Sequence, residues 1–413
     1  MIEFEKFQLS NGLNVVIHED HKTPLIAVDI LYHVGSKNER WGRTGFAHLF
    51  EHLMFEGSKN APGKTFDQVL QNIGADNNAY TSEDVTNYYE ILPGHELEAA
   101  LWLESDRMRF LNINQEMLDT QRDVVMEERR QRVDNQPYGT AMEKLAQLAY
   151  QVHPYRWPVI GYMDHLLEAS VEDVQNFYNT YYAPNNATLV LAGDITLSKA
   201  KELAEKYFGE FKSSGEIVRP AETEPAQNGE KREIIHESVQ LPAIFISWHS
   251  VAENHSDYPA FDLLSDILSS GKSSRMYQDL VYDKRKAQMI SAFQEQNEHP
   301  GLFVVYSIAR PGITLEDIEN EIYSQFEKIA AYGVTDYELQ KVKNMMTANF
   351  ISRFQGVGNK ADFIARYAGM YKRPELINGL LSRYESVTGA DIQRVVKKYF
   401  NPENRVVLYY LPK

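Results

Sequence analysis

Apolar and polar positions along this 413-residue chain follow a strand period first and a helix period afterwards, and this order occurs twice. In the first half, a hairpin is expected over 7–19, where Asn11 and Gly12 mark the turn, and a further strand is expected over 25–34. Beyond these strands, the pattern predicts helices over 45–55, 66–73, 96–111, 115–135, 138–150 and 171–182, and strands over 77–81, 86–92 and 187–191.

The second half repeats the pattern of the first. Residues 259–266 align with residues 45–52, and residues 399–402 align with residues 181–184 at nearly the same offset. Chance similarity between amphipathic helices is the alternative, but two independent matches favour a duplicated unit. The fold class predicted is therefore α+β, with two homologous domains that each pack helices on a mainly antiparallel or mixed sheet.

The best domain boundary lies where the apolar pattern fades. Serine, glycine and proline residues between 213 and 232 are typical of a solvated linker. An N-terminal domain is thus expected over 1–212 and a degenerate C-terminal repeat over 233–413. A parallel nucleotide-binding fold is disfavoured, because the segment 269–274 lacks the first glycine of a phosphate-binding loop.

Composition narrows the functional classes. The formal net charge of −16 makes a nucleic acid an unfavourable partner, since phosphate binding needs concentrated lysine and arginine. There is no cysteine, so thiolate nucleophiles and cysteine-bound metals are excluded, and any metal must be held by histidine and carboxylate. No secretory signal and no membrane span is seen, which predicts a soluble cytoplasmic protein, or a periplasmic one if a precursor was trimmed.

The helix expected over 45–55 carries the most specific chemistry in the chain. His48, Glu51 and His52 project from one face, because residues three and four apart share a helix face. Two imidazoles one turn apart can bind one Zn²⁺, and the carboxylate between them can take a proton from an activated water. A solvated polar patch is the alternative, but Phe46 and Phe50 in the flanks indicate a buried helix. The spacing matches the inverted zinc motif H-x-x-E-H.

A catalytic zinc usually takes a third protein ligand from elsewhere in the chain. The strongest candidate helix spans 115–135 and carries Glu127 and Glu128. Glu128 shares a face with Gln121, Val124 and Val125, which predicts that it points inward, whereas Glu127 falls on a charged face. A surface ion pair is the alternative for either glutamate. Periodicity alone leaves both interpretations open.

The segment 45–56 resembles the zinc motif of the pitrilysin-type metallopeptidases, in particular the half-length bacterial chains similar to mitochondrial processing peptidase. The stretches 74–81, 153–155 and 182–194 also match that family. The resemblance implies that His48, His52 and Glu128 bind one zinc ion per chain and that Glu51 is the general base. It also implies that a peptide substrate binds as an added strand along the edge formed by Asn78, Ala79 and Tyr80.

Two departures from the family pattern affect the expected assembly. Gln121 stands where the family often has a second glutamate. The arginine and tyrosine that the family's second half supplies for substrate and oxyanion are replaced by Val281 and Gln288. We therefore expect a heterodimer with a homologous chain that carries the Arg/Tyr pair. A homodimer in which Arg275 and Tyr277, or Arg310, take over is the alternative.

The second copy of the unit is expected to hold no metal, because its residues at the metal positions are Asp262, Ser265 and Asp266. The function predicted is that of a zinc metalloendopeptidase acting on peptides or unfolded polypeptides, as the catalytic subunit of a two-chain clamshell. The alternative is a non-catalytic scaffold or peptide-binding subunit of a larger complex. The intact set of His48, Glu51, His52 and Glu128 weighs against that alternative.

Overall fold

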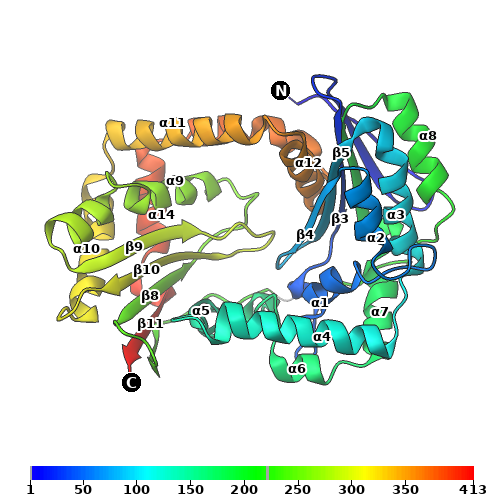
Figure 1. Cartoon of the computed structure of the whole chain (residues 1–413). Coiled ribbons are helices and arrows are strands. Elements are labelled where there is room, and N and C mark those ends of the chain that lie inside the picture. The colour runs from blue at the N-terminus through cyan, green and yellow to red at the C-terminus, as the bar shows by residue number, and fades with distance from the viewer. Residues whose placement is uncertain (1, 220–222) are drawn as a thin grey trace. The chain divides into compact units, whose positions relative to one another are not determined.

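The computed structural model describes residues 2–219 and 223–413, which form strands and helices in the order that a duplicated α+β chain requires (Figure 1). The strands are β1 (Glu5–Gln8), β2 (Asn14–Glu19), β3 (Leu25–Tyr32), β4 (Asp76–Thr81), β5 (Thr86–Pro93), β6 (Ala187–Gly193), β7 (Lys231–Glu237), β8 (Ala243–His249), β9 (Ala287–Gln294), β10 (Leu302–Ala309) and β11 (Arg405–Pro412). The helices are α1 (Phe46–Leu53), α2 (Thr65–Asn72), α3 (Leu97–Phe110), α4 (Gln115–Arg129), α5 (Ala141–Ala149), α6 (Met163–Leu167), α7 (Val171–Tyr181), α8 (Leu197–Phe208), α9 (Tyr258–Ser269), α10 (Leu315–Tyr332), α11 (Asp336–Arg353), α12 (Val357–Tyr371), α13 (Leu380–Glu385) and α14 (Gly389–Tyr399).

The strands form two sheets with the same topology. The first sheet has the order β1-β2-β6-β3-β5-β4 and the second has the order β7-β11-β8-β10-β9. Among the described strands, β2 is parallel to β6 and β7 is parallel to β11, while the other neighbours are antiparallel. Apart from β1, each strand of the first sheet has a counterpart in the second with the same neighbours and directions. The predicted fold class, two homologous α+β domains with mixed sheets, is confirmed.

Local sequence signals recur at equivalent places in the two halves. α7 begins with a capping box in which Ser170 and Asp173 exchange side-chain and backbone hydrogen bonds, and α14 begins with the same arrangement at Thr388 and Asp391. Each of these helices leads into an interior strand of its sheet, β6 or β11. The alignment of residues 181–184 with residues 399–402 therefore reflects two equivalent helix-to-strand connections.

The chain divides into two compact units that differ from the expected domains 1–212 and 233–413, because each half of the chain gives a segment to the other unit. Residues 220–222 of the expected linker lie outside the described residues. A helical period shows that a segment packs on a sheet but not on which sheet, so these exchanged segments were not predictable from the pattern. The first unit consists of Met1–Arg129, Trp157–Ala221 and Phe350–Gly379, and the second of Arg130–Arg156, Glu222–Asn349 and Leu380–Lys413.

The exchanged segments cover the otherwise open faces of the two sheets. In the first unit, α1, α3, α7 and α8 pack on one face of the sheet, and α12 lies on β3 and β6 at the opposite face. In the second unit, α9, α10 and α14 cover one face, and α5 packs on β8 and β11 at the other. Each sheet is therefore buried on both faces by helices from both halves of the sequence.

Two glycines bring α12 close to the first sheet. A Cβ at Gly369 would lie 2.4 Å from Leu31 Cδ2, and a Cβ at Gly358 would lie 2.5 Å from Ile91 Cδ1. Such distances leave no room for a side chain. Near the start of the helix, Lys360 Nζ binds Asp20 Oδ2 at 2.5 Å, an ion pair whose two side chains are both largely buried. Shape and charge together hold α12 on this face.

A buried polar layer lies between α12 and the sheet. Asn87 Nδ2 is 3.2 Å from Asp29 Oδ2 and 3.2 Å from Asp362 Oδ1, and Tyr80 donates its hydroxyl to Asp362 Oδ1 at 2.6 Å. Asp29 has no solvent exposure. Burial raises the pKa of the Asp29 carboxyl well above its ordinary value, and the neighbouring Asp362 raises it further. Burial also raises the pKa of Asp362.

The first hairpin is present, but its loop is longer than the two-residue turn expected at Asn11 and Gly12. Residues 9–13 lie between β1 and β2, and Leu9 donates its N–H to Leu13 O at 3.0 Å. Gly12 has a φ of 95°, in the left-handed region that glycine tolerates. Asn11 and Gly12 therefore mark the turn correctly, while the loop also includes Leu9 and Ser10 before them and Leu13 after them.

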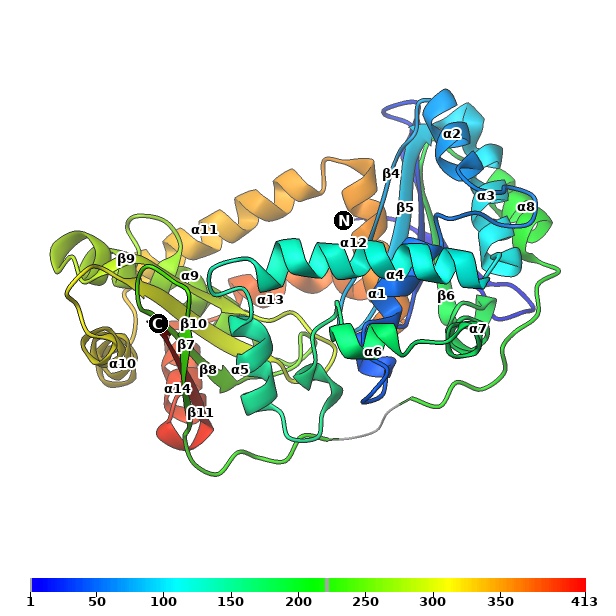
Figure 2. The same ribbon diagram turned by 60° about the horizontal axis from the view of Figure 1, so that its bottom comes forward.

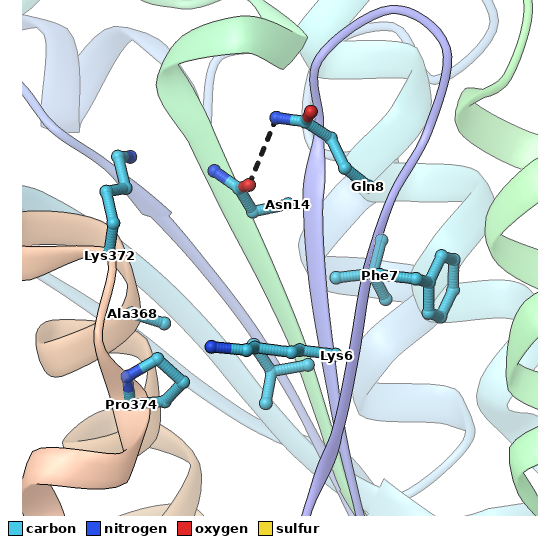
Figure 3. Close-up of a pocket in the computed structure, with 9 residues that line it drawn as sticks. Lys6, Phe7, Gln8, Asn14, Ala368, Lys372 and Pro374 are labelled. Carbon is cyan, nitrogen blue, oxygen red and sulfur yellow. Dashed lines mark hydrogen bonds between the residues drawn. The ribbon is translucent and has the colours of Figure 1, made fainter.

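A hollow of about 310 Å³ lies at the β1–β2 end of the first sheet, beside the end of α12. Figure 3 shows residues that line it. Gln8 donates to Asn14 Oδ1 at 3.2 Å, and Lys6 extends toward Pro374 (Figure 3). Lys6 also pairs with Glu375 at 3.3 Å.

Within the described part of the chain, none of the helices combines the length and the apolar character that crossing a bilayer needs.

Replacing Asp29 by asparagine tests the buried carboxyl layer. Because the folded pKa of Asp29 lies above its unfolded value, its contribution to stability is complete in acid and is lost as the pH rises through the folded pKa. Asp29→Asn keeps an acceptor for Asn87 and carries no charge. We expect it to raise the free energy of unfolding by about 1–3 kcal/mol at pH 8 and to change it little at pH 4.

Thermal and urea unfolding between pH 4 and pH 8 measure this effect. Asp283→Asn, at an exposed aspartate, is the matched control and should leave the profile unchanged. An Asp29→Asn effect of the same size at every pH would contradict a buried, protonated Asp29.

Candidate metal centre

The helix α1, which carries the H-x-x-E-H motif, is capped by a carboxylate from upstream in the chain. Its N-cap is Gly45, with a φ of 88° and no side chain to bind the first N–H groups. Glu39 takes that role: Oε2 accepts from Gly45 N at 2.9 Å and Oε1 accepts from Ala47 N at 2.8 Å. Burial raises the pKa of the Glu39 carboxyl, and the backbone N–H donors oppose that rise.

One face of α1 is committed to the core, and this orients the other face. Leu49, Phe50 and Leu53 are fully buried, and Phe50 stacks on Tyr182 with ring centroids 4.9 Å apart. Tyr178 lies parallel to Phe50 at 6.2 Å. The opposite face of α1 carries the two histidines and Glu51 of the motif, which are each partly buried.

Glu128 lies near the end of α4, which runs beside α1 (Figures 1 and 2). The sequence prediction that Glu128 points inward and Glu127 outward agrees with their exposure. Val124 was expected on the inward face, and this was wrong: its side chain is 44% exposed, whereas Val125 is fully buried. The inward face of α4 is therefore centred one residue further along the helix than the pattern indicated.

A glycine contact joins the end of α4 to the start of α1. Gly45 and Gly161 touch so closely that a Cβ at Gly161 would lie 2.4 Å from Gly45 Cα. Arg129, next to Glu128, donates to Gly161 O at 2.8 Å. Further along the two helices, Gln121 Nε2 donates to Glu56 Oε1 at 2.7 Å. Gln121 on α4 thus binds a carboxylate that follows α1 in the chain.

The structure brings His48, His52 and Glu128 into one cluster. Nε2 of His48 lies 3.6 Å from Glu128 Oε2, and Nε2 of His52 lies 3.3 Å from the same oxygen. In the described part of the chain, this is the group of histidine and carboxylate donors close enough to share an ion, with one donor atom from each residue within 4.8 Å of the others. Two imidazoles and one carboxylate are a donor set that catalytic zinc uses. The residues present fit such an ion.

Glu51 contacts a residue that sequence reasoning missed. Thr81, the last residue of β4, donates its hydroxyl to Glu51 Oε2 at 2.6 Å. Asn78, Ala79 and Tyr80 precede it on β4, which is an edge strand of the first sheet. The predicted base and the predicted substrate strand are therefore in direct contact.

A short segment before α1 binds the turn that follows Thr81. Lys37 N–H donates to Glu83 O at 3.0 Å, and Lys37 Nζ binds Asp84 Oδ1 at 2.7 Å with both side chains buried. Gly35 allows the close approach, since a Cβ there would lie 2.5 Å from the Glu83 carbonyl. The same segment ends at Glu39, the cap of α1. We call residues 35–39 the bracket.

Neither Thr81 nor Glu39 carries a motif signal of its own. Glu39 lies six residues before Gly45, outside the range of an ordinary N-cap. One weak clue was available: the helix begins after a glycine, so its first N–H groups need a partner from elsewhere. For Thr81, the only clue was its place beside the expected substrate strand.

The positions equivalent to the metal motif serve a different purpose in the second unit. On α9, Asp262 accepts the hydroxyl of Tyr384 at 2.8 Å, and Ser265 donates to the Asp262 carbonyl at 2.7 Å. Burial raises the pKa of Asp266. Val281 lies in the π-helical segment Tyr277–Asp283, partly buried against the second core.

Comparisons with known proteins agree along the whole chain. Residues 14–162 match the family model described as insulinase (peptidase family M16), and residues 168–346 match the model of the peptidase M16 inactive domain. The zinc protease PqqE of Helicobacter pylori is 33% identical over 99% of this chain and 93% of that protein. A probable mitochondrial-processing peptidase subunit beta of Arabidopsis thaliana is 25% identical over 95% of this chain and 75% of that protein.

Solved structures show the same fold. The crystal structure of a protease from Helicobacter pylori matches with a TM-score of 0.95 at 33% identity, covering all of both chains. A peptidase M16 inactive domain from Pseudomonas fluorescens matches with a TM-score of 0.90 at 16% identity, covering all of this chain and 98% of the other. With sequence similarity of this extent along the full chain, the protein belongs to the M16 family of peptidases.

Proposed function

We propose that this chain is a zinc metalloendopeptidase that hydrolyses peptides or unfolded polypeptides. The observation that carries the proposal is the convergence of His48 and His52 on one oxygen of Glu128, with Glu51 on the same helix face as the histidines. Relatives named zinc proteases support it. The side chains of the three donors are 12%, 24% and 16% exposed, so the cluster is shielded but open to small molecules.

In this proposal His48, His52 and Glu128 hold the metal. A zinc ion, when bound, supplies Lewis-acid polarisation of the scissile carbonyl and makes water more acidic. Two neutral imidazoles and one carboxylate leave a net positive charge on such an ion, which suits that chemistry.

Glu51 acts as the general base and then as the general acid. Its carboxylate takes a proton from the attacking water and returns that proton to the leaving amine. Glu51 is on the same helix as two of the three donors but is not itself one of the group that faces the ion. One side chain on one rigid helix turn thus performs both proton transfers.

The peptide substrate binds along the outer edge of β4. Within Asn78, Ala79 and Tyr80, that edge strand turns the backbone groups of alternate residues away from β5, toward an added strand. Recognition through the backbone places few demands on substrate sequence. The Tyr80 hydroxyl donates to Asp362 on α12, and this hydrogen bond restrains the Tyr80 side chain on the strand.

The chain works in a heterodimer with a homologous chain that carries the Arg/Tyr pair. Val281 and Gln288 provide neither a guanidinium nor a phenol at those places. The arginines of the homodimer alternative have other partners: Arg275 is bound by both carboxylate oxygens of Glu338, at 2.6 and 2.8 Å, and Arg310 donates to Ala287 O at 3.1 Å. Relatives named as a beta subunit support the two-chain assembly.

A non-catalytic scaffold or peptide-binding subunit is the second candidate, favoured by the absence of the Arg/Tyr pair from Val281 and Gln288. It predicts peptide affinity without turnover.

Glu51→Gln is expected to keep zinc and lose hydrolysis. The amide has nearly the shape of the carboxylate but cannot accept the proton, so kcat should fall by about 10²- to 10⁴-fold. Cleavage of a quenched fluorescent peptide and metal analysis measure the two properties. Glu127→Gln, at the exposed neighbour of Glu128, is the matched control. Wild-type turnover in Glu51→Gln would show that Glu51 is not the base.

Glu128→Ala is expected to lose zinc where Glu127→Ala does not. Removing one of three donors leaves two imidazoles, and the affinity for zinc should fall by a factor of about 10 to 100 or more. Zinc per chain after dialysis against a weak chelator gives the result. Equal zinc retention by both variants would exclude Glu128 as a ligand.

The chain purified alone is expected to bind peptide and hydrolyse it slowly, with full activity only after a homologous chain holding the Arg/Tyr pair is added. Size-exclusion chromatography and peptide cleavage follow assembly and activity together. If the homodimer forms the site instead, the chain alone is fully active and Arg275→Gln or Arg310→Gln abolishes that activity.

A further inference from the structure

We propose that Thr81 is a positioning residue for the reaction: its hydroxyl holds the carboxylate of Glu51 in the orientation that proton transfer requires. The proposal rests on the peptidase function proposed above and extends it to a residue outside the zinc motif. Its basis is the hydrogen bond of 2.6 Å from Thr81 Oγ1 to Glu51 Oε2.

That hydrogen bond restrains the orientation of the Glu51 carboxylate. Glutamate has three rotatable side-chain bonds, and a partly buried one samples several rotamers unless a partner selects one. A hydroxyl that donates to a carboxylate makes a short, charge-assisted bond. Threonine suits the task, because its β-branch leaves few χ1 rotamers and so places the hydroxyl reproducibly.

The alternation of side chains along β4 selects Thr81 for this role. Tyr80 binds Asp362, on the α12 face of the sheet. Residues next to each other in a strand point to opposite faces, so Thr81 and Ala79 point toward α1. Ala79 packs against the first core and has no side-chain donor. Thr81 is therefore the residue at this end of β4 that can bind Glu51.

The position of Thr81 is itself fixed by its neighbours. Thr81 pairs with Thr86 across the β4–β5 hairpin, and Thr86 donates its hydroxyl to Val34 O at 2.9 Å. In the turn, Ser82 N–H donates to Val85 O at 2.8 Å, and Ser82 Oγ accepts from Val85 N at 3.1 Å. The hydroxyl of Thr81 thus comes from a closed turn rather than from a loose strand end.

The bracket, residues 35–39, contacts both elements that carry the partners of this hydrogen bond, the turn after Thr81 and the helix α1. Lys37 binds Asp84 in the turn after Thr81, and Glu39 caps α1, which carries Glu51. A shift of β4 relative to α1 would have to break one of these buried contacts. These buried contacts therefore fix the distance between Thr81 and Glu51.

This arrangement links the substrate strand to the base. A peptide that adds to β4 lies beside the strand whose last residue orients Glu51. The position of β4 therefore determines both the register in which the peptide binds and the orientation of the base. Loss of the Thr81 hydroxyl should affect the chemical step and leave peptide binding, which uses the backbone of Asn78 to Tyr80, nearly unchanged.

The test compares Thr81→Val, which keeps the shape and removes the donor, with Thr81→Ser, which keeps the donor. Thr81→Val is expected to lower kcat about 10- to 100-fold with KM, zinc content and thermal midpoint close to wild type. Thr81→Ser is expected to retain most of the activity. Thr180→Val, at an exposed threonine of α7, is the control for loss of a hydroxyl.

Crystal structures of the zinc-loaded variants give a readout that is independent of turnover. We expect the Glu51 carboxylate to move or to become disordered in Thr81→Val and to stay in place in Thr81→Ser. Wild-type kcat in Thr81→Val, or an unmoved carboxylate, would overturn the positioning role alone. Absence of zinc-dependent hydrolysis by the wild-type chain with its partner would overturn the proposed function, and the positioning role with it.

Discussion

The geometry of the candidate site depends on the bracket, residues 35–39 of the segment that joins β3 to α1. Glu39 supplies the cap that Gly45 lacks, and Lys37 forms a buried ion pair with Asp84. Breaking a buried pair by removing one partner costs several kcal/mol, because the other charge stays buried. Such contacts resist small displacements. A helix of eight residues, too short to be stable by itself, is in this way held at a defined place beside β4.

On the opposite face of the same sheet, the packing of α12 has an unfavourable and a favourable consequence. α12 approaches closely because Gly358 and Gly369 have no side chains, and this contact places the partly buried Asp362 near the fully buried Asp29. Two carboxyls in one apolar contact are unfavourable unless protonated or hydrogen-bonded. In return, Tyr80 on the edge strand is bound by Asp362, so the strand beside the site is supported from behind.

Features set by local spacing were predictable, and features set by tertiary contact were not. His48, Glu51 and His52 share a face because of helix geometry alone, and Glu128 could be separated from Glu127 by the buried Val125. The exposed Val124 shows the limit of such periodicity, which is uncertain by about one residue. Thr81, Glu39 and the Lys37–Asp84 pair come together only through the fold, as do α5 and α12 on the sheets of the opposite halves.

The duplicated unit shows that the frame of such a site is separable from its chemistry. α9 follows β8 as α1 follows β3, with the same sheet topology around it. On α9, however, the residues at the equivalent positions bind groups of their own unit: Asp262 accepts from Tyr384, and Ser265 donates to the backbone carbonyl of Asp262. On α1, His48 and His52 instead turn toward a carboxylate on another helix. An active site therefore needs more than the helix and its register: its polar groups must converge across two elements, and that convergence requires contacts such as Gly45 with Gly161.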